Sequence, residues 1–262
     1  MAKTTKQTTK AKPGTKKQPR VVESSFNLAS YHEESRDLFG SLILVLPLFV
    51  LYQVGVLATG GVRNGVDFVT DLMWRLADYQ LGSYLLINLG ILVAFVIAIF
   101  ALRKSGTFKP KLYPWVIAES TAYAMMLGSG VVFVMSSLGL DALLATGSGG
   151  DFGLFTSVVL SLGAGLYEET VFRLILMGGM FYAGSRWMKL PTWLAAVGAL
   201  LISSFIFSAI HYVGPLADSF MLGSFIFRFF AGILLAAIFY LRGFAVAVYT
   251  HAIYDIIVMV FN

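Results

Sequence analysis

Residues 167–173 read Tyr-Glu-Glu-Thr-Val-Phe-Arg, and they lie inside a long apolar run from Phe152 to Tyr182. Two carboxylates and a guanidinium therefore stand where the neighbouring residues are suited to lipid. A charge near the bilayer centre costs at least a few kcal/mol, so such residues are functional candidates that face a bundle interior. A structural salt bridge would need only one of the two glutamates, which leaves the other for chemistry.

Helical spacing assigns these charges to different faces. Glu169 and Arg173 are four residues apart, with the acid first, which is the favoured order for an ion pair on a helix. Glu168 is turned by about 100° from Glu169 at the helical period. We therefore expect Arg173 to neutralise Glu169, and Glu168 to remain able to exchange a proton.

The composition indicates a multi-pass membrane protein. The chain has 262 residues, of which 58% are hydrophobic and 13% are charged, whereas about one-quarter of a soluble domain is charged. Cysteine is absent, which excludes disulfides, thiolate metal sites and a cysteine nucleophile. The first apolar run begins near Leu38, behind a polar segment too long for a signal peptide, so we expect a first membrane span there.

The N-terminal segment is strongly basic. Residues 1–20 hold seven Lys or Arg and no acidic residue. A cationic tail beside a membrane segment is typical of the cytoplasmic side and of contact with anionic lipid, and we expect no nucleic-acid partner. Residues 1–37 are predicted to form a disordered tail and an interfacial stretch, and residues 38–262 the transmembrane domain.

The apolar segments predict an all-α polytopic bundle with about seven spans. They cover approximately residues 41–59, 82–102, 113–138, 152–182, 191–213, 220–241 and 244–261. An eighth span would have to come from residues 60–81 or from the fourth segment. That segment would be about 46 Å long as an α-helix, against a hydrocarbon core of about 30 Å. It must therefore tilt, protrude or break, with close packing or a bend at Gly163-Ala164-Gly165.

The distribution of Lys and Arg predicts the orientation. With the N-terminus inside, the cytoplasmic segments hold 15 of these residues, and the outside loops hold only Arg63 and Arg75. This asymmetry follows the positive-inside rule. We expect an integral multi-pass membrane protein with a cytoplasmic N-terminus, in the cell membrane if the source is bacterial.

Further polar residues lie in the later spans. The fifth span ends at His211, and the seventh carries His251 and Asp255, which are four residues apart and share a helical face. The sixth contains Arg228, for which we expect Glu169, Asp255 or a substrate group as partner. Two glutamates, two histidines and an aspartate make a set suited to proton transfer or metal binding, beyond what helix packing needs.

Three motifs in this order resemble the CPBP family. They are Glu168-Glu169-x-x-x-Arg173, Phe207-x-x-x-His211 and His251-x-x-x-Asp255. That family comprises type II CAAX prenyl endopeptidases and bacteriocin-processing or bacteriocin-immunity membrane proteins, also called Abi proteins. The resemblance covers about residues 152–262.

The resemblance implies an intramembrane endopeptidase that acts on a membrane-associated or prenylated protein or peptide. By analogy with the family, Glu168 and His211 activate a water molecule, while His251 and the residue at 255 stabilise the oxyanion. The supporting residues would be Glu169, Arg173, Phe207 and Arg228.

Two features of this site stay open at the level of sequence. Glu168, His211 and His251 are a candidate three-ligand zinc set, and the family has been described as metalloproteases. A water activated by Glu and His without metal is equally consistent, and we slightly favour it. Asp255 stands where the family often has Asn. Because an ionised carboxylate cannot donate to an oxyanion, we expect Asp255 to orient His251.

Two other classes compete with the protease. A non-catalytic membrane adaptor or bacteriocin-immunity protein would keep the motifs as structure. A proton-coupled transporter would also use intramembrane Glu and His. It ranks last, because transporters commonly contain internal repeats and this sequence has none that we detect.

Overall fold

The computed structural model describes residues 28–59, 75–78, 80–106, 108–143, 153–214 and 217–261. Within these ranges every regular element is a helix, which confirms the predicted all-α class. Residues 1–27 of the expected tail and interfacial stretch, most of residues 60–81 and most of residues 139–153 lie outside the described residues.

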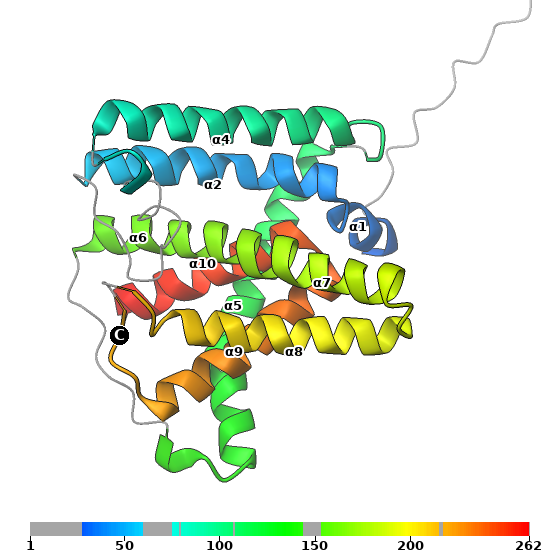
Figure 1. Cartoon of the computed structure of the whole chain (residues 1–262), viewed down its shortest axis with the longest axis vertical. Coiled ribbons are helices and arrows are strands. Elements are labelled where there is room, and N and C mark those ends of the chain that lie inside the picture. The colour runs from blue at the N-terminus through cyan, green and yellow to red at the C-terminus, as the bar shows by residue number, and fades with distance from the viewer. Residues whose placement is uncertain are drawn as a thin grey trace, which may run out of the picture.

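The predicted spans correspond to helices of the bundle in Figure 1. A short helix, α1 (Leu28–Ser35), precedes them. The long helices are α2 (Leu38–Ala58), α4 (Leu81–Leu102), α5 (Tyr113–Ser137, preceded by η1, Pro110–Leu112), α8 (Thr192–Ile210) and α9 (Leu222–Arg242). These five are long and apolar enough to cross a membrane. The fourth predicted span is a helical segment from Leu154 to Trp187, and the seventh is the shorter apolar helix α10 (Phe244–Phe261).

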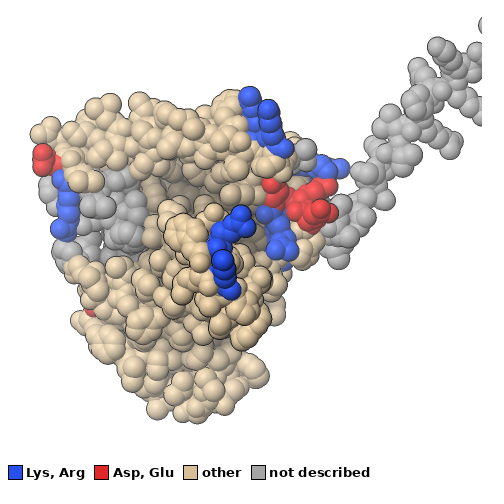
Figure 2. All heavy atoms as spheres, turned by 45° about the vertical axis from the view of Figure 1, so that its right-hand side comes forward, with Lys and Arg blue, Asp and Glu red and all other residues tan. Residues whose placement is uncertain are grey.

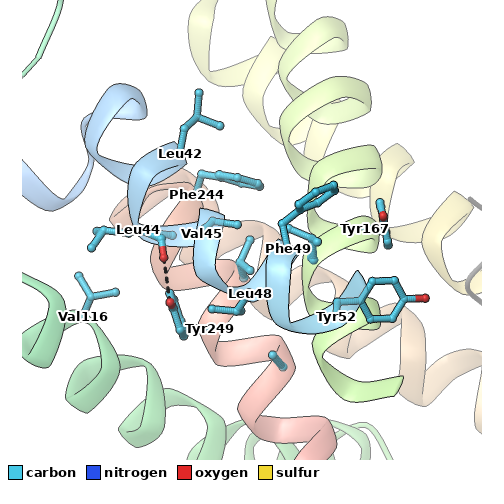
Figure 3. Close-up of a cluster of buried hydrophobic side chains, with 14 of the residues drawn as sticks. Leu42, Leu44, Val45, Leu48, Phe49, Tyr52, Val116, Tyr167, Phe244 and Tyr249 are labelled. Carbon is cyan, nitrogen blue, oxygen red and sulfur yellow. Dashed lines mark hydrogen bonds between the residues drawn. The ribbon is translucent and has the colours of Figure 1, made fainter. Parts of the chain in front are cut away.

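Helix α10 lies at the centre of the bundle and contacts α2, α5, α6, α9 and η3. Its residues from Phe244 to Ala252 are all buried. Figure 3 shows part of this core, where the Tyr249 hydroxyl donates to the carbonyl of Leu44 at 2.8 Å. Since a side chain on this helix is held by neighbours on every side, α10 provides a rigid support for His251 and Asp255.

The Leu154–Trp187 segment changes its winding without breaking. It consists of α6 (Leu154–Gly163), the π-helical η3 (Ala164–Met177), α7 (Gly178–Tyr182) and the π-helical η4 (Ala183–Trp187). At the end of η3 the N–H of Gly178 donates to the carbonyl of Arg173, five residues earlier. Wide turns of this kind occur frequently at functional sites, and here they hold the whole Glu-Glu-x-x-x-Arg motif.

The predicted close packing at Gly163-Ala164-Gly165 is confirmed. A Cβ added to Gly163 would lie 2.3 Å from the ring of Tyr52 on α2. One added to Gly165 would lie 2.7 Å from the Cβ of Ala252 and 2.8 Å from the carbonyl oxygen of Val248. Gly163, at the end of α6, therefore leaves room for the Tyr52 ring, and Gly165 lets η3 approach the backbone of α10.

Charged side chains gather at one end of the bundle. This end holds α1, the connection from α4 to α5 and the turn between η4 and α8 (Figure 1). Figure 2 shows blue and red side chains there, on a surface that is otherwise mostly uncharged. The exposed basic residues are Arg36, Arg103, Lys104, Lys111, Arg186 and Lys189. We call this the charged end.

Candidate active site

Three helical elements bring the motif residues together. Glu168, Glu169 and Arg173 come from η3, Phe207 and His211 from the C-terminal end of α8, and His251 and Asp255 from α10. All of them are buried except Asp255, which is partly exposed. Residues more than 80 positions apart in the chain therefore form one polar cluster inside an apolar bundle.

Glu169 lies at the centre of this cluster. Its Oε2 is 3.2 Å from Nε of Arg173, so the ion pair predicted from helical spacing is present. Its Oε1 accepts a hydrogen bond from Nδ1 of His251 at 2.8 Å. Both side chains of the Glu169–Arg173 pair are almost completely inaccessible. Glu169 thus compensates the buried guanidinium and also fixes the orientation of the His251 ring.

Arg173 connects the first two motifs. Its Cζ lies 4.2 Å from the ring centroid of Phe207, a cation–π distance. Its Nη2 donates to the carbonyl of Gly232 on α9 at 3.4 Å. The sequence analysis did not identify this acceptor. Every residue has a backbone carbonyl, so the residue type could not single out Gly232 as an acceptor. The only sign in the sequence is that Gly232 and Ala236 are small, which allows α9 to approach closely.

Glu168 is the carboxylate that Arg173 does not neutralise. Among the described residues its nearest charged partner is His251, whose Nε2 lies 3.7 Å from Oε2 of Glu168. The same nitrogen is 3.5 Å from Oδ2 of Asp255. Both separations exceed a direct hydrogen bond. His251 therefore turns one nitrogen to Glu169 and the other to a space flanked by two carboxylates.

His211 is connected to the cluster by its contacts with Phe207. Its Nδ1 donates to the carbonyl of Phe207 at 2.8 Å, because a carbonyl can only accept. In the neutral ring this leaves Nε2 as a proton acceptor. The Phe207 ring lies 5.1 Å from that of His211 and 6.0 Å from that of His251, measured between centroids. Within the described part of the chain, His211 makes no ion pair with Glu168.

Among the described residues Arg228 forms its ion pair with neither of the carboxylates expected for it, and a substrate group as its partner stays a prediction. Its guanidinium pairs with Asp218 at 2.5 Å and donates to the hydroxyl of Tyr212 at 3.1 Å. Glu169 is already neutralised by Arg173, and Asp218 lies in the segment that leads into α9. Arg228 therefore belongs to a partly exposed pair beside the cluster, and within the described chain it makes no direct ion pair with Glu169 or Asp255.

The three candidate zinc ligands do not fit a metal site as they are placed. Among the residues that the structure describes, no three His, Cys, Asp or Glu side chains are grouped to hold an ion. Nδ1 of His251 faces Glu169 and Nδ1 of His211 faces the Phe207 carbonyl. Of the two histidines only the Nε2 atoms remain, and the Glu168 carboxylate lies 3.7 Å from that of His251.

Comparison with known proteins supports the resemblance drawn from the motifs. No curated protein and no solved structure matches the chain. Residues 150–257, however, match the model of the family described as type II CAAX prenyl endopeptidase Rce1-like. This segment includes Glu168, His211, His251 and Asp255. The match confirms the resemblance to the CPBP family for the segment that carries all three motifs.

Proposed function

We propose that this protein is an intramembrane endopeptidase of the CAAX type, which hydrolyses a peptide bond in a membrane-associated or prenylated protein or peptide. One observation supports this above all. Of two adjacent buried glutamates, Glu169 is paired with Arg173, while Glu168 forms no ion pair with Arg or Lys among the described residues and lies 3.7 Å from Nε2 of His251. A structural ion pair does not need this second carboxylate.

In this proposal Glu168 is the general base and His211 helps to hold the water. The Glu168 carboxylate takes a proton from the water, and the hydroxide oxygen bonds to the peptide carbonyl carbon. The carbon–nitrogen bond then breaks, and the proton passes to the departing amine. Nε2 of His211 is an acceptor for the second hydrogen of the water, because its Nδ1 carries the ring proton.

His251 is the donor to the oxyanion in this proposal. Its Nδ1 hydrogen bond to Glu169 sets the plane of the ring, and a doubly protonated ring donates from Nε2 to the developing negative charge. Glu169 is then the residue that orients His251, a role expected for Asp255 from the sequence. Asp255 lies beside Nε2 at 3.5 Å and supports that side of the ring.

The activity can be tested with the full chain reconstituted in lipid vesicles. The substrates would be a farnesylated peptide that ends in a CAAX sequence and the same peptide without the lipid. Mass spectrometry would detect the released C-terminal fragment. We expect cleavage by the wild type, and loss of at least about 100-fold in Glu168→Gln and His211→Ala. Asp78→Asn, an exposed site away from the cluster, is the matched control. Full cleavage by either active-site variant would overturn the assignment.

A further inference from the structure

A cavity of about 560 Å³ lies between α5 and α9, apart from the catalytic cluster. This volume is in the range of pockets that hold small ligands. On α9 the cavity is lined by Leu234, Ala237, Ile238 and Leu241. Gly232 on the same helix instead faces Phe207 and Ser204, where an added Cβ would lie 3.0 to 3.2 Å away. Helix α9 therefore separates the cavity from the active-site cluster.

The walls of the cavity are apolar over most of their length. Helix α5 contributes Tyr123, Met126, Leu127 and Gly130. These positions are spaced by three and four residues, as are those on α9, so each helix presents a single face. Met126 and Leu241 are more than half exposed. The cavity is therefore open to the surroundings of the bundle, which for a membrane-spanning helix pair is lipid.

The end of the cavity at the charged end is cationic. It is lined there by His32, Arg36 and Arg242, and no acidic residue is among the described lining residues. Arg242 is already neutralised by Glu119, which accepts from its Nη2 at 2.8 Å. Arg36 is exposed, donates to the carbonyl of Tyr240 at 3.1 Å, and takes part in no ion pair within the described chain. It is a cation available to a ligand.

The cationic and apolar parts are arranged along the bundle. Helix α5 leads away from the charged end, and α9 leads towards it. Both walls therefore extend from the charged end into the apolar part of the bundle. From Tyr123 to Gly130 the wall rises by seven helical steps, or about 10 Å. The cavity is thus complementary to an amphiphile with an anionic head group. It has a cation at one end and an apolar groove beyond it.

We propose that this cavity binds an anionic phospholipid, with the phosphate at Arg36 and one acyl chain between α5 and α9. Arginine forms two parallel hydrogen bonds with a phosphate group. Basic residues beside membrane spans attract the anionic lipids of the adjacent leaflet. The site is independent of the proposed protease activity, because none of its residues belongs to the catalytic cluster.

Native mass spectrometry of the detergent-solubilised full chain tests this proposal. Phosphatidylglycerol and phosphatidylcholine with identical acyl chains would be titrated against the wild type. We expect phosphatidylglycerol to bind about tenfold more tightly, because both lipids carry the phosphate but phosphatidylcholine also carries a quaternary ammonium beside it, which the guanidinium of Arg36 repels. Arg36→Gln should remove this preference. Arg103→Gln, at an exposed arginine of the same end that does not line the cavity, should keep it.

A second pair of variants tests the apolar groove. Gly130→Leu places a side chain in the cavity, where even its Cβ would lie 3.6 Å from Leu234, and should weaken the binding of both lipids. Gly90→Leu, which meets no atom within 4 Å on α4, is the matched control and should bind as the wild type does.

Three results would overturn the proposal. They are equal affinity for the two lipids, full phosphatidylglycerol preference in Arg36→Gln, and displacement of the lipid by a farnesylated peptide. The last would assign the groove to a substrate chain. Glu168→Gln should bind phosphatidylglycerol normally. Failure of the lipid site is therefore distinguishable from failure of the protease assignment.

Discussion

At the scale of the residue, two adjacent glutamates have different surroundings. The pairing of Glu169 with Arg173 could be predicted from the sequence, because a spacing of four places both on one face of a helix. The hydrogen bond from His251 to Glu169 could not. This hydrogen bond depends on how α10 packs against η3. The two residues are 82 positions apart in the chain, and no local sequence pattern shows that they meet.

The role of Glu169 predicts a loss of stability in Glu169→Ala. The substitution leaves the guanidinium of Arg173 buried without its carboxylate, and breaking a buried pair costs about 3–5 kcal/mol. Thermal unfolding in detergent should show a clearly lower midpoint and a lower yield. Glu33→Ala, at an exposed residue of α1, should unfold as the wild type does. A Glu169→Ala protein with unchanged stability would contradict this account of the cluster.

At the scale of the element, the Leu154–Trp187 helix is the unusual one. Its excess length and its two close-packing glycines could be predicted, since both follow from residue types and counts. The sequence analysis left open whether the helix would tilt, protrude or break, and it did not foresee the change to π winding at Ala164. Winding of this kind depends on contacts with neighbouring helices, here Tyr52 on α2 and Ala252 on α10.

Gly165→Ala tests whether this packing positions the site. The new Cβ would meet backbone atoms of α10, which cannot move aside as a side chain can. Overpacking of this kind costs about 1–3 kcal/mol, and it would also move Glu168 relative to His251. We expect lower stability together with a reduced kcat. Gly179→Ala, where nothing lies within 4 Å, should change neither. Wild-type kcat and stability in Gly165→Ala would show that the close approach is not required.

At the scale of the whole molecule, α1 is fastened to the charged end of the bundle. Glu119 on α5 accepts from Tyr31 on α1 and from Arg242 on α9, and Nη2 of Arg242 donates to Ser35 at 3.1 Å. Burial, followed by the hydrogen bond to Glu119, raises the pKa of Tyr31, so its hydroxyl stays a donor. The sequence could place Glu119 only near the end of a span, since its partners are distant in the chain.

The position of the charged end predicts the orientation of the bundle. Because the chain has no cysteine, a single introduced cysteine reports the orientation of the bundle without background labelling of this protein. Ser105→Cys lies at the charged end and Ser137→Cys at the other end of α5. In intact cells, a membrane-impermeant maleimide should label Ser137→Cys and spare Ser105→Cys. Both should be labelled in opened membranes. The reverse pattern in intact cells would contradict a cytoplasmic charged end.

The most direct test of the central claim compares protein termini in membranes from cells that carry the wild type and cells that carry Glu168→Gln at matched expression. Glutamine keeps the shape of the side chain but cannot act as a base. We predict a set of new termini found only with the wild type, and these would also identify the substrate. Identical termini, with both proteins folded and equally abundant, would contradict proteolysis and favour a non-catalytic membrane adaptor.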